Sequence, residues 1–193
     1  DIMNLSGDLR YVQPKYFTSA QALGLDYMQL YDAHTELGRW LRTKNIMEKI
    51  GNQLFLHAGL SPEVSGLQFS IEKINAVCQP YYGVPPAQMP DSVRVFFGAA
   101  SPFWYRGYFI APKIPEAVLD ASLSQFGVKR IIVGHTILSS NIGSYYNGKV
   151  IGIDVNHHEG HHAAALYERQ QWFVVDTSGY RFPLREVSPG AVQ

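Results

Sequence analysis

The spacing of apolar residues predicts that the first 50 residues are mostly helical. Between residues 30 and 41, apolar side chains recur at steps of three and four residues, which is the period of one helix face, at Leu30, Ala33, Leu37 and Leu41. Asp26 precedes this run, and its carboxylate can accept a hydrogen bond from a backbone N–H of the first turn. We therefore expect a helix from Asp26 to Leu41, with Gly38 as a weak point or a second start.

Three segments carry the signal of a β-hairpin. Residues 45–58 contain two apolar stretches around Gly51-Asn52, and residues 145–153 contain two around Asn147-Gly148. Both dipeptides suit a tight turn because glycine and asparagine tolerate positive φ. Residues 163–176 form a similar pair of apolar stretches around residues 169–171. We expect antiparallel pairing in all three segments.

Two further helices and a buried strand are predicted. Residues 66–79 have an amphipathic helical pattern, and residues 115–126 form a second helical segment with Pro115 in its first turn. Gly127 ends this helix, and residues 128–133, which end in the apolar run Ile131-Ile132-Val133, are predicted to form a short buried strand. Helices that alternate with strands and end in antiparallel hairpins predict a single α/β domain with a mixed sandwich.

The composition favours a folded enzyme over a nucleic-acid or membrane protein. Of the 193 residues, 46% are hydrophobic and 17% charged, so the chain can bury a core. The formal net charge is zero, which provides no electrostatic attraction to nucleic acid or an anionic membrane. We expect a soluble protein without nucleic-acid or membrane partners, and the compartment, cytoplasm or periplasm, stays open.

Two histidines stand directly after apolar strands. His57 follows Leu54-Phe55-Leu56, and His135 follows Ile131-Ile132-Val133-Gly134. Open α/β sheets bind ligands at the carboxyl ends of their strands, and neutral imidazole is a common metal ligand. A histidine at a strand end can instead be an ordinary hydrogen-bonded residue of the core or surface.

An arginine among aromatic residues lies between the two histidines in the sequence. Arg106 belongs to the motif Trp104-Tyr105-Arg106-Gly107. Its planar guanidinium matches the oxygens of a phosphate group in pairs. The alternative is a structural arginine that stacks on Trp104. Tyr105 is a weaker candidate for the lining of a phosphate pocket.

The three motifs in this order resemble the calcineurin-like metallophosphoesterases, specifically their bacterial serine/threonine-phosphatase-like branch. The resemblance implies an αββα sandwich with mixed sheets and a centre of two divalent ions, Mn, Fe or Zn, that activates a water. It implies that His57 and His135 bind metal and that Arg106 binds substrate phosphate. Phosphoryl transfer requires such positioning and charge stabilisation from the protein more than covalent chemistry.

The first residues extend the resemblance. Residues 1–12, Asp1-Ile2-Met3-Asn4-Leu5-Ser6-Gly7-Asp8-Leu9-Arg10-Tyr11-Val12, are similar to the segment that follows the Gly-Asn-His motif of the family. We therefore expect residues 1–193 to be the carboxyl-terminal portion of a single metallophosphoesterase domain. On this interpretation the chain has no intact catalytic residue, binds no metal pair and is inactive. Strand edges such as residues 128–133 would be uncovered, so we expect association with a second copy or with the missing amino-terminal portion.

A histidine-rich segment follows the strand at residues 150–154. Residues 156–162, Asn156-His157-His158-Glu159-Gly160-His161-His162, contain four histidines. In the family, the loop after this strand borders the active site, so Asn156, His157 and His158 are candidates for its rim. Histidine-rich tracts bind metals in some proteins, whereas a solvated loop is the alternative. Arg10 is better explained as a structural partner of Asp8 than as a phosphate ligand.

The function expected from the resemblance is hydrolysis of phosphomonoesters, including those of phosphoproteins. Two alternatives stay open. The chain could be a non-catalytic fragment or interaction domain that retains the fold, or part of a dinucleoside polyphosphate hydrolase, an activity of nearby relatives.

Overall fold

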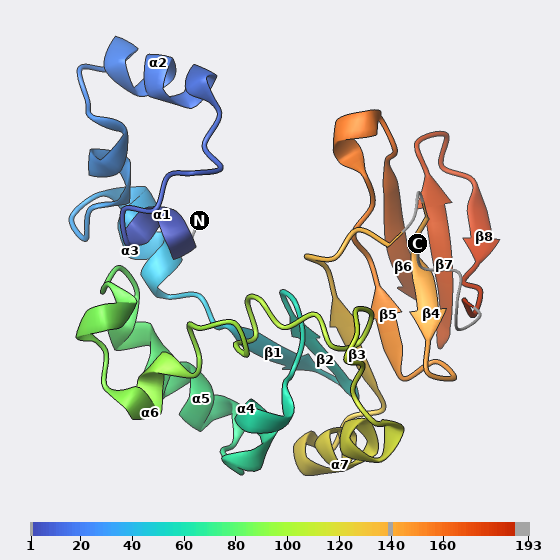
Figure 1. Cartoon of the computed structure of the whole chain (residues 1–193). Coiled ribbons are helices and arrows are strands. Elements are labelled where there is room, and N and C mark those ends of the chain that lie inside the picture. The colour runs from blue at the N-terminus through green and yellow to red at the C-terminus, as the bar shows by residue number, and fades with distance from the viewer. Residues whose placement is uncertain (1, 139–140, 188–193) are drawn as a thin grey trace. The chain divides into compact units, whose positions relative to one another are not determined.

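The computed structural model describes residues 2–138 and 141–187, and Asp1 lies outside this part. The chain divides into two compact units (Figure 1). The first consists of Asp1–Ile46 and Glu72–Arg94, and the second of Met47–Ile71 and Val95–Gln193. The interpretation of residues 1–193 as one portion of a single metallophosphoesterase domain stays a prediction.

The first unit is helical, as the sequence predicts. Its elements are α1 (Ile2–Leu5), α2 (Pro14–Ala22), the 3₁₀ helix η1 (Tyr27–Tyr31), α3 (Glu36–Arg42), α5 (Ile71–Cys78), the 3₁₀ helices η2 (Gln79–Tyr81) and η3 (Pro86–Gln88), and α6 (Asp91–Arg94). Asp26 caps η1, because its carboxylate accepts the N–H of Met28 at 2.9 Å. The cap predicted at Asp26 is therefore confirmed.

The helix expected between residues 26 and 41 is interrupted. The hydroxyl oxygen of Thr35 accepts the N–H of Gly38 at 3.1 Å and begins α3 as a new helix. A Cβ atom at position 38 would lie 2.0 Å from the carbonyl oxygen of Asp32. Gly38 is therefore the residue that allows the preceding turn to pack this closely, and it lies within the second helix.

The second unit contains a mixed five-stranded sheet. Its strands are β1 (Met47–Ile50), β2 (Gln53–Leu56), β3 (Arg130–Val133), β4 (Gly143–Tyr145) and β5 (Val150–Gly152), in the order β1-β2-β3-β5-β4. β3 pairs in parallel with β2 and β5, whereas β1 and β4 are antiparallel to their neighbours. This arrangement confirms the hairpins predicted at residues 45–58 and 145–153. It also shows that the unpaired edge expected at residues 128–133 is wrong, because β3 has a partner on each side.

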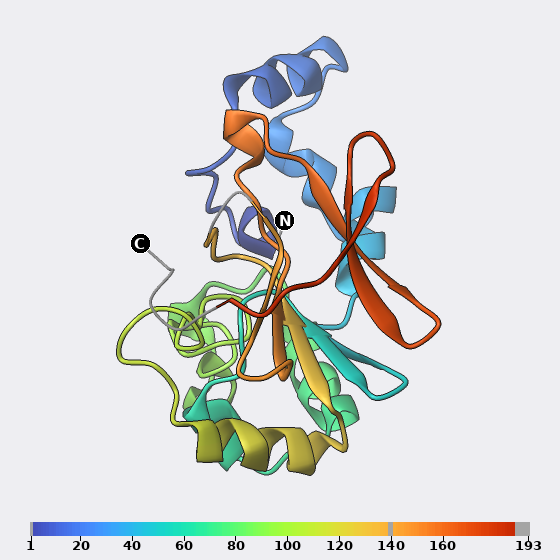
Figure 2. The same cartoon turned by 90° about the vertical axis from the view of Figure 1, so that its right-hand side faces the viewer.

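A second, antiparallel sheet packs against the first (Figures 1 and 2). It consists of β6 (Ala163–Glu168), β7 (Gln171–Asp176) and β8 (Arg181–Pro183), and β8 was not predicted. Arg169 and Gln170 form the turn of the predicted β6–β7 hairpin with φ values of 49° and 65°. The core between the sheets contains Ile132, Ile142, Ile151 and Val155, against which Trp172, Val174 and Leu184 pack.

In Figure 1, two helices lie near the strands β1, β2 and β3. They are α4 (Pro62–Gly66) and α7 (Glu116–Phe126). The helix α7 ends as predicted, with Gly127 in the left-handed region at φ 58°, and begins one residue later than predicted, because Pro115 is its extended N-cap. The hydroxyl of Ser122 in α7 donates to that of Ser65 in α4 at 3.2 Å. The helix predicted over residues 66–79 is instead divided between α4 and α5, because Ser61 and Pro62 begin a separate short helix.

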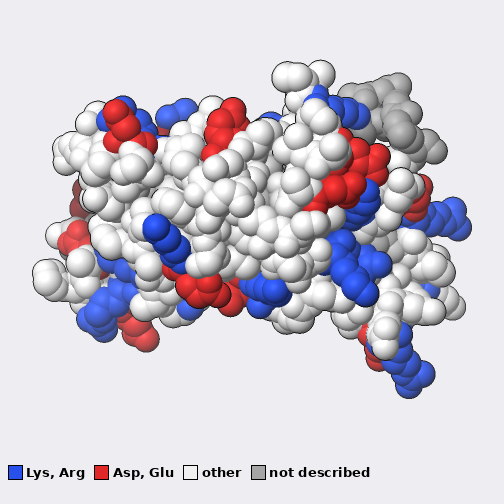
Figure 3. Space-filling view, turned by 90° about the horizontal axis from the view of Figure 1, so that it is seen from below, with Lys and Arg blue, Asp and Glu red and all other residues white. Residues whose placement is uncertain are grey.

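The distribution of charged side chains on the surface is consistent with the zero net charge. On the face shown in Figure 3, Lys and Arg side chains are interspersed with Asp and Glu side chains. Within residues 2–138 and 141–187, no helix has the length and apolar character needed to cross a membrane.

Candidate active site

The two histidines follow neighbouring parallel strands. His57 comes directly after β2, and His135 comes two residues after the end of β3. In the register of these strands Leu56 lies opposite Val133, and the N–H of Gly134 donates to the carbonyl oxygen of His57 at 2.8 Å. The strand pairing therefore continues to the histidines and places them side by side at the carboxyl ends, where this fold class binds ligands.

The two imidazole rings face each other. The Nε2 atom of His57 lies 3.1 Å from the Nδ1 atom of His135, and the ring centroids are 4.8 Å apart. The backbone of His135 has a φ of 62°, which is uncommon for a residue other than glycine. Strained backbone of this kind concentrates at functional sites, where the surrounding structure holds it.

Arg106 lies beside this histidine pair. Its Nη1 atom donates to the carbonyl oxygen of His135 at 3.5 Å and to the hydroxyl of Thr136 at 3.4 Å, and its side chain is exposed. The ring of Trp104 meets the ring of His135 edge-on, with centroids 5.2 Å apart. Trp104 thus contacts His135, and the structure records no stacking of Arg106 on Trp104 within residues 2–138 and 141–187.

Tyr105 points back into the protein between two glycines. A Cβ atom at Gly107 would lie 2.2 Å from the Tyr105 hydroxyl, and one at Gly59 would lie 2.9 Å from its carbonyl oxygen. Burial raises the pKa of Tyr105 to about 12, so its hydroxyl stays protonated at neutral pH. This packing joins the segments that carry His57 and Arg106, and the role of Tyr105 at the rim of the site stays a prediction.

Both histidines are held in the neutral form. Burial, with Arg106 and His57 nearby, lowers the pKa of His135 to about 4. Burial also lowers the pKa of His57, although the carboxylate of Asp154 acts in the opposite direction. Metal binding requires the unprotonated imidazole, and the lowered pKa of each ring favours this form.

The pair fits part of a metal site. Two nitrogens that bind one ion at about 2.0–2.1 Å lie roughly 2.9–3.4 Å apart, depending on the bond angle, and the observed 3.1 Å is in this range. The Nε2 atom of His135 is buried and has no hydrogen-bond partner in the described chain. Within residues 2–138 and 141–187, however, no group of three or more His, Cys, Asp or Glu side chains could hold a metal ion.

The rim candidates lie in the 3₁₀ helix η4 (His157–Glu159) and at its N-cap, Asn156. His157 pairs with His162 of the same loop, and His158 is exposed to solvent. A role of Asn156, His157 and His158 at the active site stays a prediction. Arg10, in the first unit, pairs with Asp8 at 2.6 Å, as expected.

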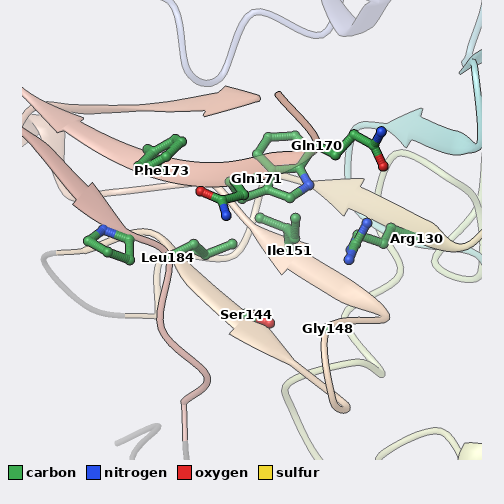
Figure 4. A pocket seen from close by; sticks show the side chains of 10 residues that line it. Arg130, Ser144, Gly148, Ile151, Gln170, Gln171, Phe173 and Leu184 are labelled. Carbon is green, nitrogen blue, oxygen red and sulfur yellow. The ribbon is translucent and has the colours of Figure 1, made fainter. Parts of the chain in front are cut away.

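A separate pocket of about 420 Å³ lies between the two sheets (Figure 4). It is lined by residues of both sheets, among them Arg130, Ser144, Ile151, Gln171, Phe173 and Leu184. Arg130 is the first residue of β3, whereas His135 follows the last, so this pocket lies toward the opposite end of that strand. The buried Nε1 atom of Trp172, which also lines the pocket, has no hydrogen-bond partner among the described residues.

Three residues near the histidines were not among the candidates from the sequence. They are Trp104, which contacts His135, Thr136, which accepts from Arg106, and Asp154, which acts electrostatically on His57. Trp104 belongs to the motif that contains Arg106, and Thr136 directly follows His135, so the motifs themselves contained a signal for both residues. Asp154 follows β5, the strand next to β3, and strand adjacency cannot be read from its local sequence.

The fold places the chain in a known structural class. The mixed α/β structure with its five-stranded sheet matches part of the metallophosphoesterase fold. A crystal structure of the cold-active protein tyrosine phosphatase of a psychrophile, Shewanella sp., superimposes with a TM-score of 0.86 at 34% sequence identity. The match covers 95% of this chain and 56% of that one. A second structure, of a cold-active protein tyrosine phosphatase at 1.1 Å, gives a TM-score of 0.87 and 34% identity over 96% of this chain and 55% of that one.

A curated plant protein is also similar. Shewanella-like protein phosphatase 2 of Arabidopsis thaliana is 32% identical over 127 residues, which are 63% of this chain and 31% of the plant protein. No family model matches the chain. The chain is therefore related to the Shewanella-like and cold-active phosphatases of the calcineurin-like type, which confirms the resemblance. It spans about half the length of the solved relatives and about a third of the plant protein.

Proposed function

We propose that this chain carries the histidine and arginine part of the active site of a metal-dependent phosphatase. The observation that carries the proposal is the convergence of His57 Nε2 and His135 Nδ1 at 3.1 Å, with Arg106 beside them. Residues from two strand ends and an intervening loop meet at one point, and all three are residue types that phosphate hydrolysis uses.

In this proposal His57 and His135 bind one divalent ion through the facing nitrogens. A bound ion of the Mn, Fe or Zn group would supply Lewis acidity toward the phosphate and lower the pKa of a nearby water. The histidines contribute by remaining unprotonated, because burial and Arg106 disfavour the imidazolium form of His135. The paired strands hold both rings in place before a ligand binds, which limits the entropy lost on binding.

Arg106 binds the phosphate of the substrate. Its described hydrogen bonds are long and involve only Nη1, so Nε and Nη2 are available to oxygens of a phosphate group. A guanidinium can donate two parallel hydrogen bonds to such a group, which fixes its orientation as well as its charge. The exposure of Arg106 gives a substrate access to these donors.

The proposed substrate is a phosphoprotein. One relative is described as a protein tyrosine phosphatase and another as a Shewanella-like protein phosphatase. The rates of hydrolysis of a phosphotyrosyl peptide and a phosphoseryl peptide would show which phosphorylated residue the site prefers. Hydrolysis of diadenosine tetraphosphate in preference to both peptides would support the dinucleoside polyphosphate hydrolase instead.

Two histidines are too few for a catalytic metal centre. We propose that the other ligands lie in the part of such a phosphatase that this chain does not span, and that the chain alone is inactive. The 193-residue chain should then not hydrolyse p-nitrophenyl phosphate with Mn²⁺ above the level of its His57→Ala variant. A version that also contains the part of the solved relatives that this chain does not span should be active, and His57→Ala should abolish that activity.

The two parts of this proposal can fail separately. Hydrolysis by the 193-residue chain that His57→Ala abolishes would contradict the inactivity and support the phosphatase site. An inactive but folded longer version, tested with Mn²⁺, Fe²⁺ and Zn²⁺, would contradict the phosphatase and favour an interaction domain that retains the fold.

A further inference from the structure

A second pair of histidines faces each other in the loop between β5 and β6. The Nδ1 atoms of His157 and His162 lie 2.9 Å apart, and their ring centroids are separated by 5.2 Å at an interplanar angle of 34°. Both side chains are exposed. The pair is therefore accessible to a small ligand from solvent.

The backbone of the loop brings these two residues together. The carbonyl oxygen of Asn156 accepts the N–H groups of Glu159 at 3.1 Å and His161 at 3.2 Å. Gly160 has a φ of 81°, a left-handed conformation that reverses the chain between the two histidines. At the base of the loop Val155 belongs to the buried core between the sheets. The pairing of His157 with His162 thus results from a hydrogen-bonded turn that begins at a buried residue.

Two imidazole nitrogens at 2.9 Å must have a hydrogen atom or a cation between them, because two lone pairs that face each other repel. In a neutral pair one ring supplies the hydrogen atom as an N–H donor. A divalent ion can take the same place, since two nitrogens bound to one ion at about 2.0–2.1 Å are separated by a closely similar distance. The arrangement therefore needs little change to bind a metal.

We propose that His157 and His162 form a binding site for a divalent ion of the Ni²⁺, Cu²⁺ and Zn²⁺ group. Imidazole binds these ions well, whereas Mg²⁺ and Ca²⁺ prefer oxygen ligands. His158 and His161 are exposed on the same turn, but among the described residues no group of three or more His, Cys, Asp or Glu side chains is placed to hold a metal ion, so water would complete the coordination of this two-histidine site. The bound ion would connect the two ends of the loop and stabilise the folded chain, because it binds the unfolded chain more weakly.

The test uses a chain in which the first histidine pair is removed by His57→Gln and His135→Gln. Calorimetric titration of this variant with ZnCl₂ should show one bound ion. Adding either His157→Gln or His162→Gln should weaken the binding at least tenfold. His34→Gln is the matched control, because His34 is exposed and belongs to neither pair, and it should leave the affinity unchanged.

Copper provides a second readout that does not depend on enzymatic activity. In the same chain with His57→Gln and His135→Gln, loaded with Cu²⁺, the electron paramagnetic resonance spectrum should show coupling to at least two imidazole nitrogens. The further change His162→Gln should remove one of these couplings. Absence of zinc binding, unchanged affinity in both single variants, or an equal loss in His34→Gln would overturn the proposal.

A further variant covers the case in which removal of the first pair prevents folding. In the otherwise native chain, His157→Gln with His162→Gln should lower the number of bound zinc ions by one. An unchanged number of ions would then contradict the proposal.

Discussion

The Nε2 atom of His57 and the Nδ1 atom of His135 lie 3.1 Å apart, although the residues are separated by 78 positions in the sequence. The backbone produces this proximity, because Gly134 donates to the carbonyl oxygen of His57 and extends the pairing of β2 with β3. The geometry of the pair therefore depends on strand register. It is present before any ligand binds.

This arrangement predicts that the first pair binds zinc independently of the second. In a chain that carries His157→Gln and His162→Gln, zinc titration should detect one weak site. His57→Ala should lower its affinity at least tenfold, because a single imidazole loses the chelate. His34→Ala serves as the control and should have no effect, and an equal loss in both variants would exclude His57 as a ligand.

The environment of His135 predicts a loss of stability in acid. Its pKa is about 4 in the folded chain, against a usual value of 6.5. As the pH falls below about 6.5, the unfolded chain takes up the proton first, so folding becomes less favourable until the folded form also titrates near pH 4. After allowance for partial exposure, the effect at pH 5 is on the order of 1 kcal/mol.

Urea unfolding at pH 7 and pH 5 measures this effect. The stability difference between the two pH values should be smaller in His135→Gln than in the native chain. Titration of the histidine ring by nuclear magnetic resonance provides a direct check, and a ring of His135 that titrates near pH 6.5 would contradict the prediction.

Arg106 should be sensitive to a substitution that keeps its charge. In the longer version proposed above, Arg106→Lys should raise KM and lower kcat, because an ammonium group cannot make two parallel hydrogen bonds to phosphate. Arg181→Lys is the matched control, since Arg181 forms a surface ion pair with Glu168 at 2.7 Å. Kinetics of Arg106→Lys that equal those of the control would make Arg106 structural.

Tyr108 should stabilise the connection between two of the motifs. Its side chain is buried, and its hydroxyl oxygen accepts the N–H of Leu60 at 3.1 Å. Tyr108→Phe leaves this N–H without a partner, which should lower the free energy of unfolding by about 1–2 kcal/mol. Tyr180→Phe, at an exposed position, should change it by less than about 0.5 kcal/mol. Urea unfolding of both variants provides the comparison.

The three-stranded sheet predicts association of the chain. β6 and β8 form its edges, and the side chains of Tyr180 and Phe182 are 70% and 50% exposed. Strand edges and exposed apolar side chains promote pairing with another chain. Light scattering of the purified chain should therefore show a dimer or a larger assembly. A monodisperse monomer of 21.7 kDa would contradict this prediction.

Local sequence determined the hairpins and the helix signals at Asp26 and Gly127. Asn147-Gly148 and Gly127 adopt positive φ, and Asp26 caps a helix, because these effects depend on a few neighbouring residues. The sequence places the second helix start at Gly38, whereas α3 begins after Thr35, because the contact between Gly38 and the backbone of Asp32 cannot be derived from spacing alone. β8 was missed because it has only three residues, all exposed, and is defined by its pairing with β7.

For the candidate site, the sequence by itself indicated the candidate residues: two histidines after apolar strands and an arginine among aromatic residues. Only the tertiary structure decided that β3 lies between β2 and β5, and therefore that His57 and His135 meet. It also paired His157 with His162 and placed Trp104 against His135. The physical reason is that residue type and turn chemistry act over a few positions, whereas strand order and ring contacts depend on the packing of segments distant in the chain.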